Sequence, residues 1–165
     1  MRYLIATLVT LVVSVNVFAT SQEHINLDNR QWVLGWSSPD KSMIFDEYVL
    51  KGETVDDWSE LLTIQYFPGL NKHTNLDVFE AMQKQSLASV CPSVKWESVS
   101  VKQNDRMWKF TISNCSGQPD QSELARAIKT STGVHLIHYA IKKSPMPSRN
   151  EKAWIEILNK FDVSK

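Results

Sequence analysis

The sequence predicts an α+β fold in which two amphipathic helices pack on a largely antiparallel sheet. Short runs rich in β-branched and aromatic residues alternate with turn residues along most of the chain, as strands do. Several of these runs follow one another at hairpin spacing, and hairpins build antiparallel sheets. Two longer segments repeat apolar residues at helical spacing. We therefore expect a sandwich in which the two helices cover one face of the sheet.

The first 19 residues predict an export signal. Arg2 precedes an apolar run over 3–13, and Val17-Phe18-Ala19 forms a signal-peptidase site. We expect cleavage after Ala19, a periplasmic or secreted protein, and no stable membrane anchor afterwards. The alternative is an uncleaved anchor, which is disfavoured because the apolar run is short for a membrane span.

Removing 19 of the 165 residues leaves 146, the size of one domain. We expect a flexible lead-in over 20–30 and a single α+β domain over 31–165. The whole chain balances 18 basic against 18 acidic residues. Clusters of Lys and Arg that bind phosphate backbones or anionic membranes are therefore not expected, and nucleic acid is disfavoured as a partner.

Three strands are predicted in the first part of the domain, over 31–36, 43–50 and 59–67. Both faces of the third are at least half apolar, which predicts an inner strand covered on both sides. Between the second and third strands, Thr54 and Asp57 match a capping box, so the Thr54 hydroxyl is expected to accept the Asp57 N–H and start a helical turn.

A first helix is predicted over 75–90, after a capping-box pattern that begins at Thr74. Its inner stripe is expected to comprise Leu76, Phe79, Met82 or Gln83, Ser86 and Val90.

Two hairpins and a closing helix are predicted in the rest of the chain. The hairpin strands are expected over 94–101, 106–114, 123–129 and 134–142. The segment 123–129 also has helical propensity, but the short turn to the next run favours a strand. A further capping-box pattern at Ser148 starts the closing helix, whose inner face is expected to comprise Trp154, Ile157, Leu158 and Phe161.

Several stretches together resemble a group of uncharacterised exported bacterial proteins. These are GETVDDWSELLTIQYF, a helix ending in Cys-Pro, LARAI followed by GVHLIHYAIKK, and a late KAWIEIL helix. The order of elements is similar to the PsbP/Mog1/DcrB-like α/β sandwich. The resemblance implies a fold and no catalytic motif. Members of that fold serve as assembly factors or binding modules, although fold alone does not transfer function.

The two cysteines of an exported chain predict one disulfide, Cys91 to Cys115. The sequence has no C-x-x-C, G-x-S-x-G, S-x-x-K or H-E-x-x-H pattern and no Gly-rich phosphate loop. We therefore expect no cofactor, no metal and no enzymatic activity. His135 and His138 are the best metal suggestion, but on a strand their odd spacing sends them to opposite faces.

The binding site that we expect is Asp56, Asp57 and Trp58, at the start of the inner strand. A tryptophan supplies binding energy and carboxylates orient a partner. The function predicted is a binding or assembly module that contacts an envelope protein or a small ligand. For Trp58 alone, a core or rim anchor is the favoured interpretation. The acidic run from Asp46-Glu47 to Glu60 is expected to be a solvated face rather than a site for a cation or a basic partner.

Two other functions remain open from the sequence. One is a small hydrolase whose Glu60, His135 and His138 come together only in the fold. The other is a secreted, effector-like factor that acts on a host or a competitor.

Overall fold

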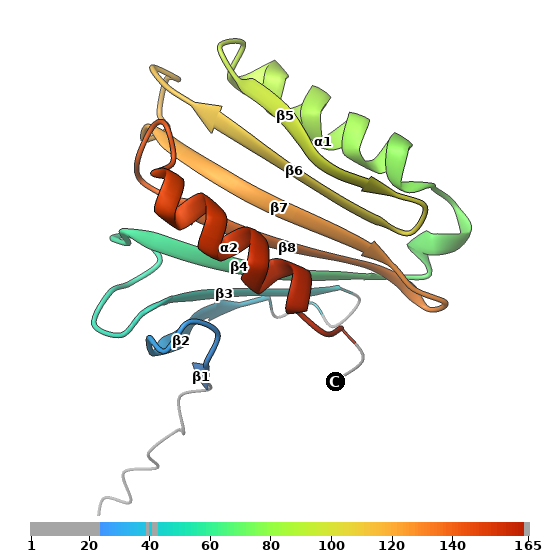
Figure 1. Cartoon of the computed structure of the whole chain (residues 1–165), viewed down its shortest axis with the longest axis horizontal. Coiled ribbons are helices and arrows are strands. Elements are labelled where there is room, and N and C mark those ends of the chain that lie inside the picture. The colour runs from blue at the N-terminus through green and yellow to red at the C-terminus, as the bar shows by residue number, and fades with distance from the viewer. Residues whose placement is uncertain (1–23, 39, 41–42, 164–165) are drawn as a thin grey trace, which may run out of the picture.

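A computed structural model of the chain describes residues 24–38, 40 and 43–163, so the predicted signal segment lies outside the described residues. Within this part, the strands form an antiparallel sheet in the order β1-β2-β3-β4-β8-β7-β6-β5, accompanied by two α-helices (Figure 1). The predicted α+β class and the antiparallel sheet are confirmed. Neither helix is long and apolar enough to cross a membrane.

The predicted strands and helices are all found, with ends that differ by a few residues. The elements are β1 (His24–Ile25), β2 (Trp32–Ser37), β3 (Ile44–Leu50), β4 (Glu60–Pro68), the 3-10 turn η1 (Leu70–Lys72), α1 (Leu76–Val90), β5 (Lys95–Lys102), β6 (Asp105–Ile112), β7 (Gln121–Lys129), β8 (Gly133–Ile141) and α2 (Ser148–Lys160). The ambiguous segment 123–129 is strand β7. As expected, β4 is an inner strand, paired with β3 and β8.

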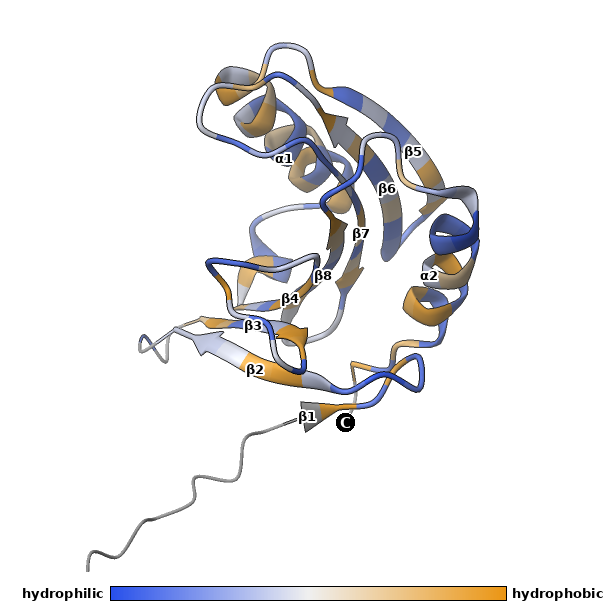
Figure 2. Ribbon diagram, turned by 90° about the vertical axis from the view of Figure 1, so that its left-hand side faces the viewer, coloured by the Kyte–Doolittle hydropathy of each residue, from blue (hydrophilic) through white to orange (hydrophobic). Residues whose placement is uncertain are grey.

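The two helices lie on opposite sides of the sheet, as Figure 2 shows, so the expectation that both cover one face is wrong. We call these sides the α1 face and the α2 face. The reason lies in the inner strands, which carry apolar residues on both faces. On β8, Leu136 belongs to the core cluster under α1, whereas Ile137 and Tyr139 belong to the cluster with α2. Each face therefore needs its own cover.

On the α2 face, the closing helix packs as predicted. Trp154 is 2% exposed, its ring stacks on Tyr139 with centroids 4.0 Å apart, and its edge contacts Trp32 at 5.6 Å. The predicted capping box at Ser148 is not formed. Ser148 is itself the first helical residue, Pro147 is the N-cap, and no side chain caps the helix.

On the α1 face, the predicted inner stripe of α1 holds for its first half. Leu76 and Phe79 are buried, but Met82 is 61% and Val90 67% exposed. Leu87, which lay outside the predicted stripe, packs against the core instead. The N-cap is Asn75 rather than Thr74, and its side chain accepts the Val78 N–H at 2.9 Å. Part of α1 therefore presents apolar side chains beyond the core.

A disulfide links the C-terminus of α1 to the end of β6, and β1 extends the sheet at its edge. Cys91 at the C-terminus of α1 and Cys115 after β6 lie at disulfide distance, with Cα atoms 5.3 Å apart, within the ordinary range for a disulfide. The lead-in expected over 20–30 is part of the fold from His24 onward, because β1 pairs with β2. Within the predicted lead-in, His24 and Ile25 thus form a strand.

Candidate functional site

The predicted contact residues Asp56, Asp57 and Trp58 lie in the loop between β3 and β4. The Thr54 hydroxyl accepts the Asp57 N–H at 3.1 Å, as expected, but a bend rather than a helical turn follows. Asp56 and Asp57 are exposed and Trp58 is half-buried. The Lys142 ammonium lies 4.6 Å from the Trp58 ring centroid. One face of this ring is thus already occupied by a cation, which favours a rim anchor.

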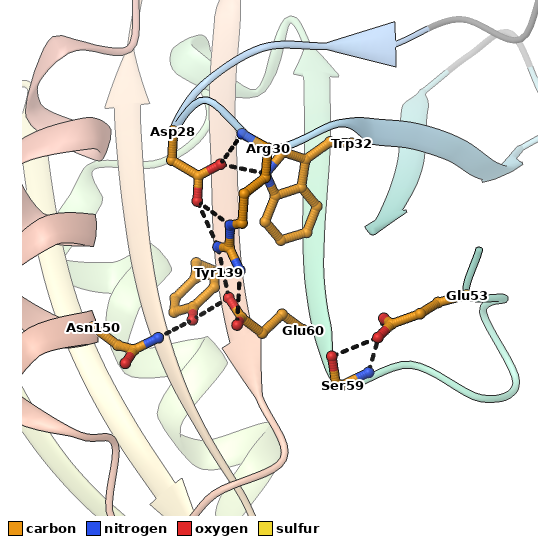
Figure 3. Close-up of polar contacts among 8 residues, drawn as sticks. All are labelled: Asp28, Arg30, Trp32, Glu53, Ser59, Glu60, Tyr139 and Asn150. Atoms are coloured by element: carbon orange, nitrogen blue, oxygen red, sulfur yellow. Dashed lines mark hydrogen bonds and ion pairs between the residues drawn. The ribbon is translucent and has the colours of Figure 1, made fainter. Parts of the chain in front are cut away.

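Glu60, one of the three hydrolase candidates, is held in a polar network on the α2 face (Figure 3). Arg30 donates to both carboxylate oxygens of Glu60, at 2.9 and 2.8 Å, and the Tyr139 hydroxyl donates at 2.6 Å. Asp28 accepts from Arg30 Nε at 2.6 Å and from Trp32 Nε1 at 3.0 Å. The hydrogen bond to Glu60 raises the pKa of Arg30, against the effect of burial. The network therefore ties the N-terminal segment to the sheet.

The same network reaches α2 through Asn150, whose side-chain amide donates to the Tyr139 hydroxyl at 3.0 Å. Burial and the hydrogen bond to Glu60 raise the pKa of Tyr139 above its ordinary value. Figure 3 also shows that Glu53 is engaged nearby, accepting from the Ser59 backbone N–H at 2.9 Å and from its hydroxyl at 2.6 Å. These carboxylates hold backbone and side chains in place.

The two histidines lie on opposite faces, as predicted. His135 stacks on Tyr66 with centroids 4.4 Å apart, and burial lowers its pKa. His138 lies on the α1 face, where its Nδ1 is 3.2 Å from Glu123 Oε2. The fold therefore does not bring Glu60, His135 and His138 together. No group of three or more His, Cys, Asp or Glu side chains within the described ranges is placed to hold a metal ion.

A pocket of about 220 Å³ lies between α1 and the α1 face of the sheet. One wall is aromatic: Trp96 of β5 stacks on Trp108 and Phe110 of β6, with centroids 5.6 and 5.5 Å apart. The register of this hairpin produces the stack, because Trp96 lies opposite Phe110. The remaining lining residues come from α1 and β8, and are Gln83, Ser86, Leu87, Val90 and His138.

Polar side chains around the pocket hold its walls in place. Glu80 of α1 accepts from Trp96 Nε1 at 3.1 Å and from the Ser98 hydroxyl at 2.8 Å, which holds the aromatic wall against the helix. His138 and Glu123 pair at the floor. The buried Trp108 Nε1–H has no hydrogen-bond acceptor within the described part of the chain. The pocket thus combines stacked rings with an oriented imidazole.

This pocket was not predicted from the sequence. Alternation could place Trp96 on a strand face, but the pocket depends on the position of α1, which single-strand patterns do not give.

Two comparisons with known proteins bear on the chain. A model of an uncharacterised protein family matches residues 19–165. The comparison with curated proteins gives no match.

Proposed function

The chain belongs to this uncharacterised family, whose model spans residues 19–165, and we propose that it is an exported, non-enzymatic binding module. Its ligand site is the pocket between α1 and the sheet. The observation that carries the proposal is the wall of stacked rings, Trp96, Trp108 and Phe110, beside the His138–Glu123 pair. Concave apolar sites with a few convergent polar groups are where proteins bind small molecules.

The size of the pocket limits the ligand. A dry protein cavity of about 150 Å³ takes up benzene, so a pocket of about 220 Å³ suits a single ring with small substituents. The stacked indole and phenyl rings favour an aromatic ring.

The polar groups indicate what the ring carries. A carboxylate only accepts hydrogen bonds, so a neutral His138 ring that donates from Nδ1 to Glu123 leaves Nε2 as an acceptor. A ligand O–H or N–H can donate to Nε2. We therefore propose a compact phenol-like ligand.

Export and the finer fold relationship are part of this proposal. The signal pattern that ends at Ala19 supports export, and the family match begins at that residue. The resemblance to the PsbP/Mog1/DcrB-like sandwich supports a binding or assembly role rather than catalysis, as an analogy of fold.

The test is calorimetric titration of the exported protein with p-cresol, with p-xylene as a probe that lacks the hydroxyl. We expect saturable binding of p-cresol and weaker binding of p-xylene. Ser86→Phe places a ring in the pocket from an exposed helix position and should abolish binding. Gln85→Phe adds the same ring to an exposed position that does not line the pocket and should leave binding unchanged. Equal binding by both variants would refute the site.

A second candidate, acid–base catalysis, is favoured by the His138–Glu123 pair because a carboxylate-oriented imidazole is a common general base. It predicts slow turnover of an aryl ester by the wild type that is lost in His138→Gln. Binding of p-cresol without any His138-dependent turnover supports the binding module instead.

A further inference from the structure

A second site lies on the α1 face of β2 and β3, away from the pocket. It begins with a β-bulge in β2, where the register with β3 shifts between Leu34 and Trp36. Leu34 pairs with Tyr48 and Trp36 with Glu47, so Gly35 is the extra residue. Bulges re-aim side chains. Without this bulge, Trp36 would lie on the α2 face; with it, Trp36 lies beside Glu47.

Gly35 is built into this arrangement. A Cβ atom there would lie 2.9 Å from Val55 Cγ1 and 3.3 Å from Val49 Cγ2. The loop that carries Val55 therefore packs directly over the bulge. Asp56 and Asp57, which follow Val55 in this loop, are exposed. The bulge thus places an aromatic ring near the acidic loop.

Trp36 is 40% exposed, so part of its ring is open to a partner. Its ring packs edge-on against Phe45, with centroids 5.3 Å apart and planes at 81°. This contact orients the ring without covering it. Directly opposed residues on neighbouring strands have Cβ atoms about 5 Å apart, so the Glu47 carboxylate lies within reach of a group that sits on the Trp36 ring.

The Glu47 carboxylate has no partner among the described residues. Among the described residues, none donates a hydrogen bond to its carboxylate and none forms an ion pair with it. Its cross-strand neighbours are Trp36 and Thr63, neither of which is charged. Burial raises the pKa of Glu47 above the ordinary value, because its charged form loses solvation and gains no partner. A carboxylate kept half-buried beside an exposed indole is therefore costly to the fold, which is a mark of functional sites.

We propose that Trp36 and Glu47 form a receptor for a basic side chain, preferably arginine, on a partner protein. A guanidinium stacks on an indole face and pairs bidentately with a carboxylate, which matches the two groups offered here. The site is an open surface, and a free small molecule is held better in an enclosed pocket. Asp56 and Asp57 add negative charge that attracts a basic segment.

The test follows the Trp36 indole N–H by NMR, assigned from the Trp36→Phe spectrum, during titration of the exported protein with Ac-Gly-Arg-Gly-NH2. The matched probe replaces arginine by citrulline, which has nearly the same shape and no charge. We expect a saturable shift with arginine and none with citrulline. Glu47→Gln and Trp36→Ala should each weaken binding by about fivefold or more. Because Trp36→Ala removes the indole probe, its titration is followed by the backbone amide signals of β3.

Asp46→Asn is the matched control, because Asp46 precedes Glu47 on the opposite face of β3 and its carboxylate accepts from Ser37 at 2.5 Å. Its affinity should stay within twofold of wild type. Equal shifts with both peptides, an unchanged affinity in Glu47→Gln, or no shift in the wild type would each overturn the proposal. Guanidinium ion that binds as tightly as the peptide would overturn the assignment to a protein partner. The pocket variant Ser86→Phe should bind the peptide normally, so this site and the pocket are tested separately.

Discussion

The hydroxyl of Tyr139 donates to the Glu60 carboxylate at 2.6 Å, within a network that joins four parts of the chain. Tyr139 belongs to β8, Glu60 begins β4, and Arg30 and Asn150 extend the contact to the N-terminal segment and α2. Buried polar networks are stabilising when every member has a partner, and removal of one member leaves the others unsatisfied.

Tyr139→Phe should therefore lower the free energy of unfolding by about 1–2 kcal/mol, because it removes two hydrogen bonds and keeps the stacking on Trp154. Urea unfolding measures the change. Tyr66→Phe is the control. Tyr66 contacts His135 through its ring, which the phenylalanine keeps, so the free energy of unfolding should change little. Equal effects in the two variants would contradict a structural role for the network.

Trp154→Ala should be the most destabilising change in α2. Trp154 is buried between Trp32 and Tyr139, and truncation of a buried tryptophan costs about 3–5 kcal/mol. The free energy of unfolding of a domain of this size is about 5–15 kcal/mol in total, so the melting midpoint should fall sharply. Glu156→Ala, at an exposed position of the same helix, should leave it nearly unchanged.

Glu47→Gln should stabilise the protein at neutral pH by about 0.5–1 kcal/mol. The folded-state pKa of Glu47 is raised above the ordinary 4.5, so the folded state binds more protons in that window and its stability falls as pH rises through it. The advantage of the glutamine variant should therefore be present near pH 7 and disappear below about pH 4.5. Glu156→Gln should show no such trend. A glutamine variant less stable than wild type at pH 7 would mean that Glu47 has a partner in the folded protein.

Reduction of the Cys91–Cys115 pair should lower stability by about 3 kcal/mol, given a sequence separation of 24 residues. Protein recovered from the producing cell and denatured without reductant should show no titratable thiol. Urea unfolding with and without reductant then gives the difference. Two reactive thiols in the untreated protein would show that the bond does not form.

Export is tested by the intact mass of protein recovered from the producing cell. We expect a chain that starts near Thr20, found in the periplasm or the medium, and separate assay of these two fractions distinguishes a periplasmic module from a secreted factor. Full-length protein retained in the membrane would contradict cleavage after Ala19.

Local patterns predicted most of the secondary structure. Strand alternation and hairpin turns are properties of neighbouring residues, so even the ambiguous segment 123–129 was assigned correctly from the short turn that follows it. The two apolar faces of the strand over 59–67 indicated that both sides of the sheet need a cover, but which helix covers which side depends on how the chain crosses between strands. The second half of the inner stripe of α1 was mispredicted because that part of the helix extends past the edge of the core. Helical periodicity does not show where the core ends.

The candidate sites depended on longer-range geometry. Glu47 was expected to be solvated as part of an acidic run, but the bulge at Gly35 places it beside Trp36. A glycine within a strand is a recognised signal for a bulge, so this one feature was accessible in principle. The pocket at Trp96 was not, because it needs both the hairpin register and the position of α1.

The position of β8 has a consequence for when the chain can fold. It is the last strand in sequence, yet it lies at the centre of the sheet between β4 and β7 (Figure 1). Until residues 133–141 have been synthesised, the inner edges of β4 and β7 have no strand to pair with, and joining the two halves requires contacts between distant parts of the chain. In a chain of this topology the sheet can be completed only when synthesis is almost finished. Such late closure would favour passage across a membrane before folding begins.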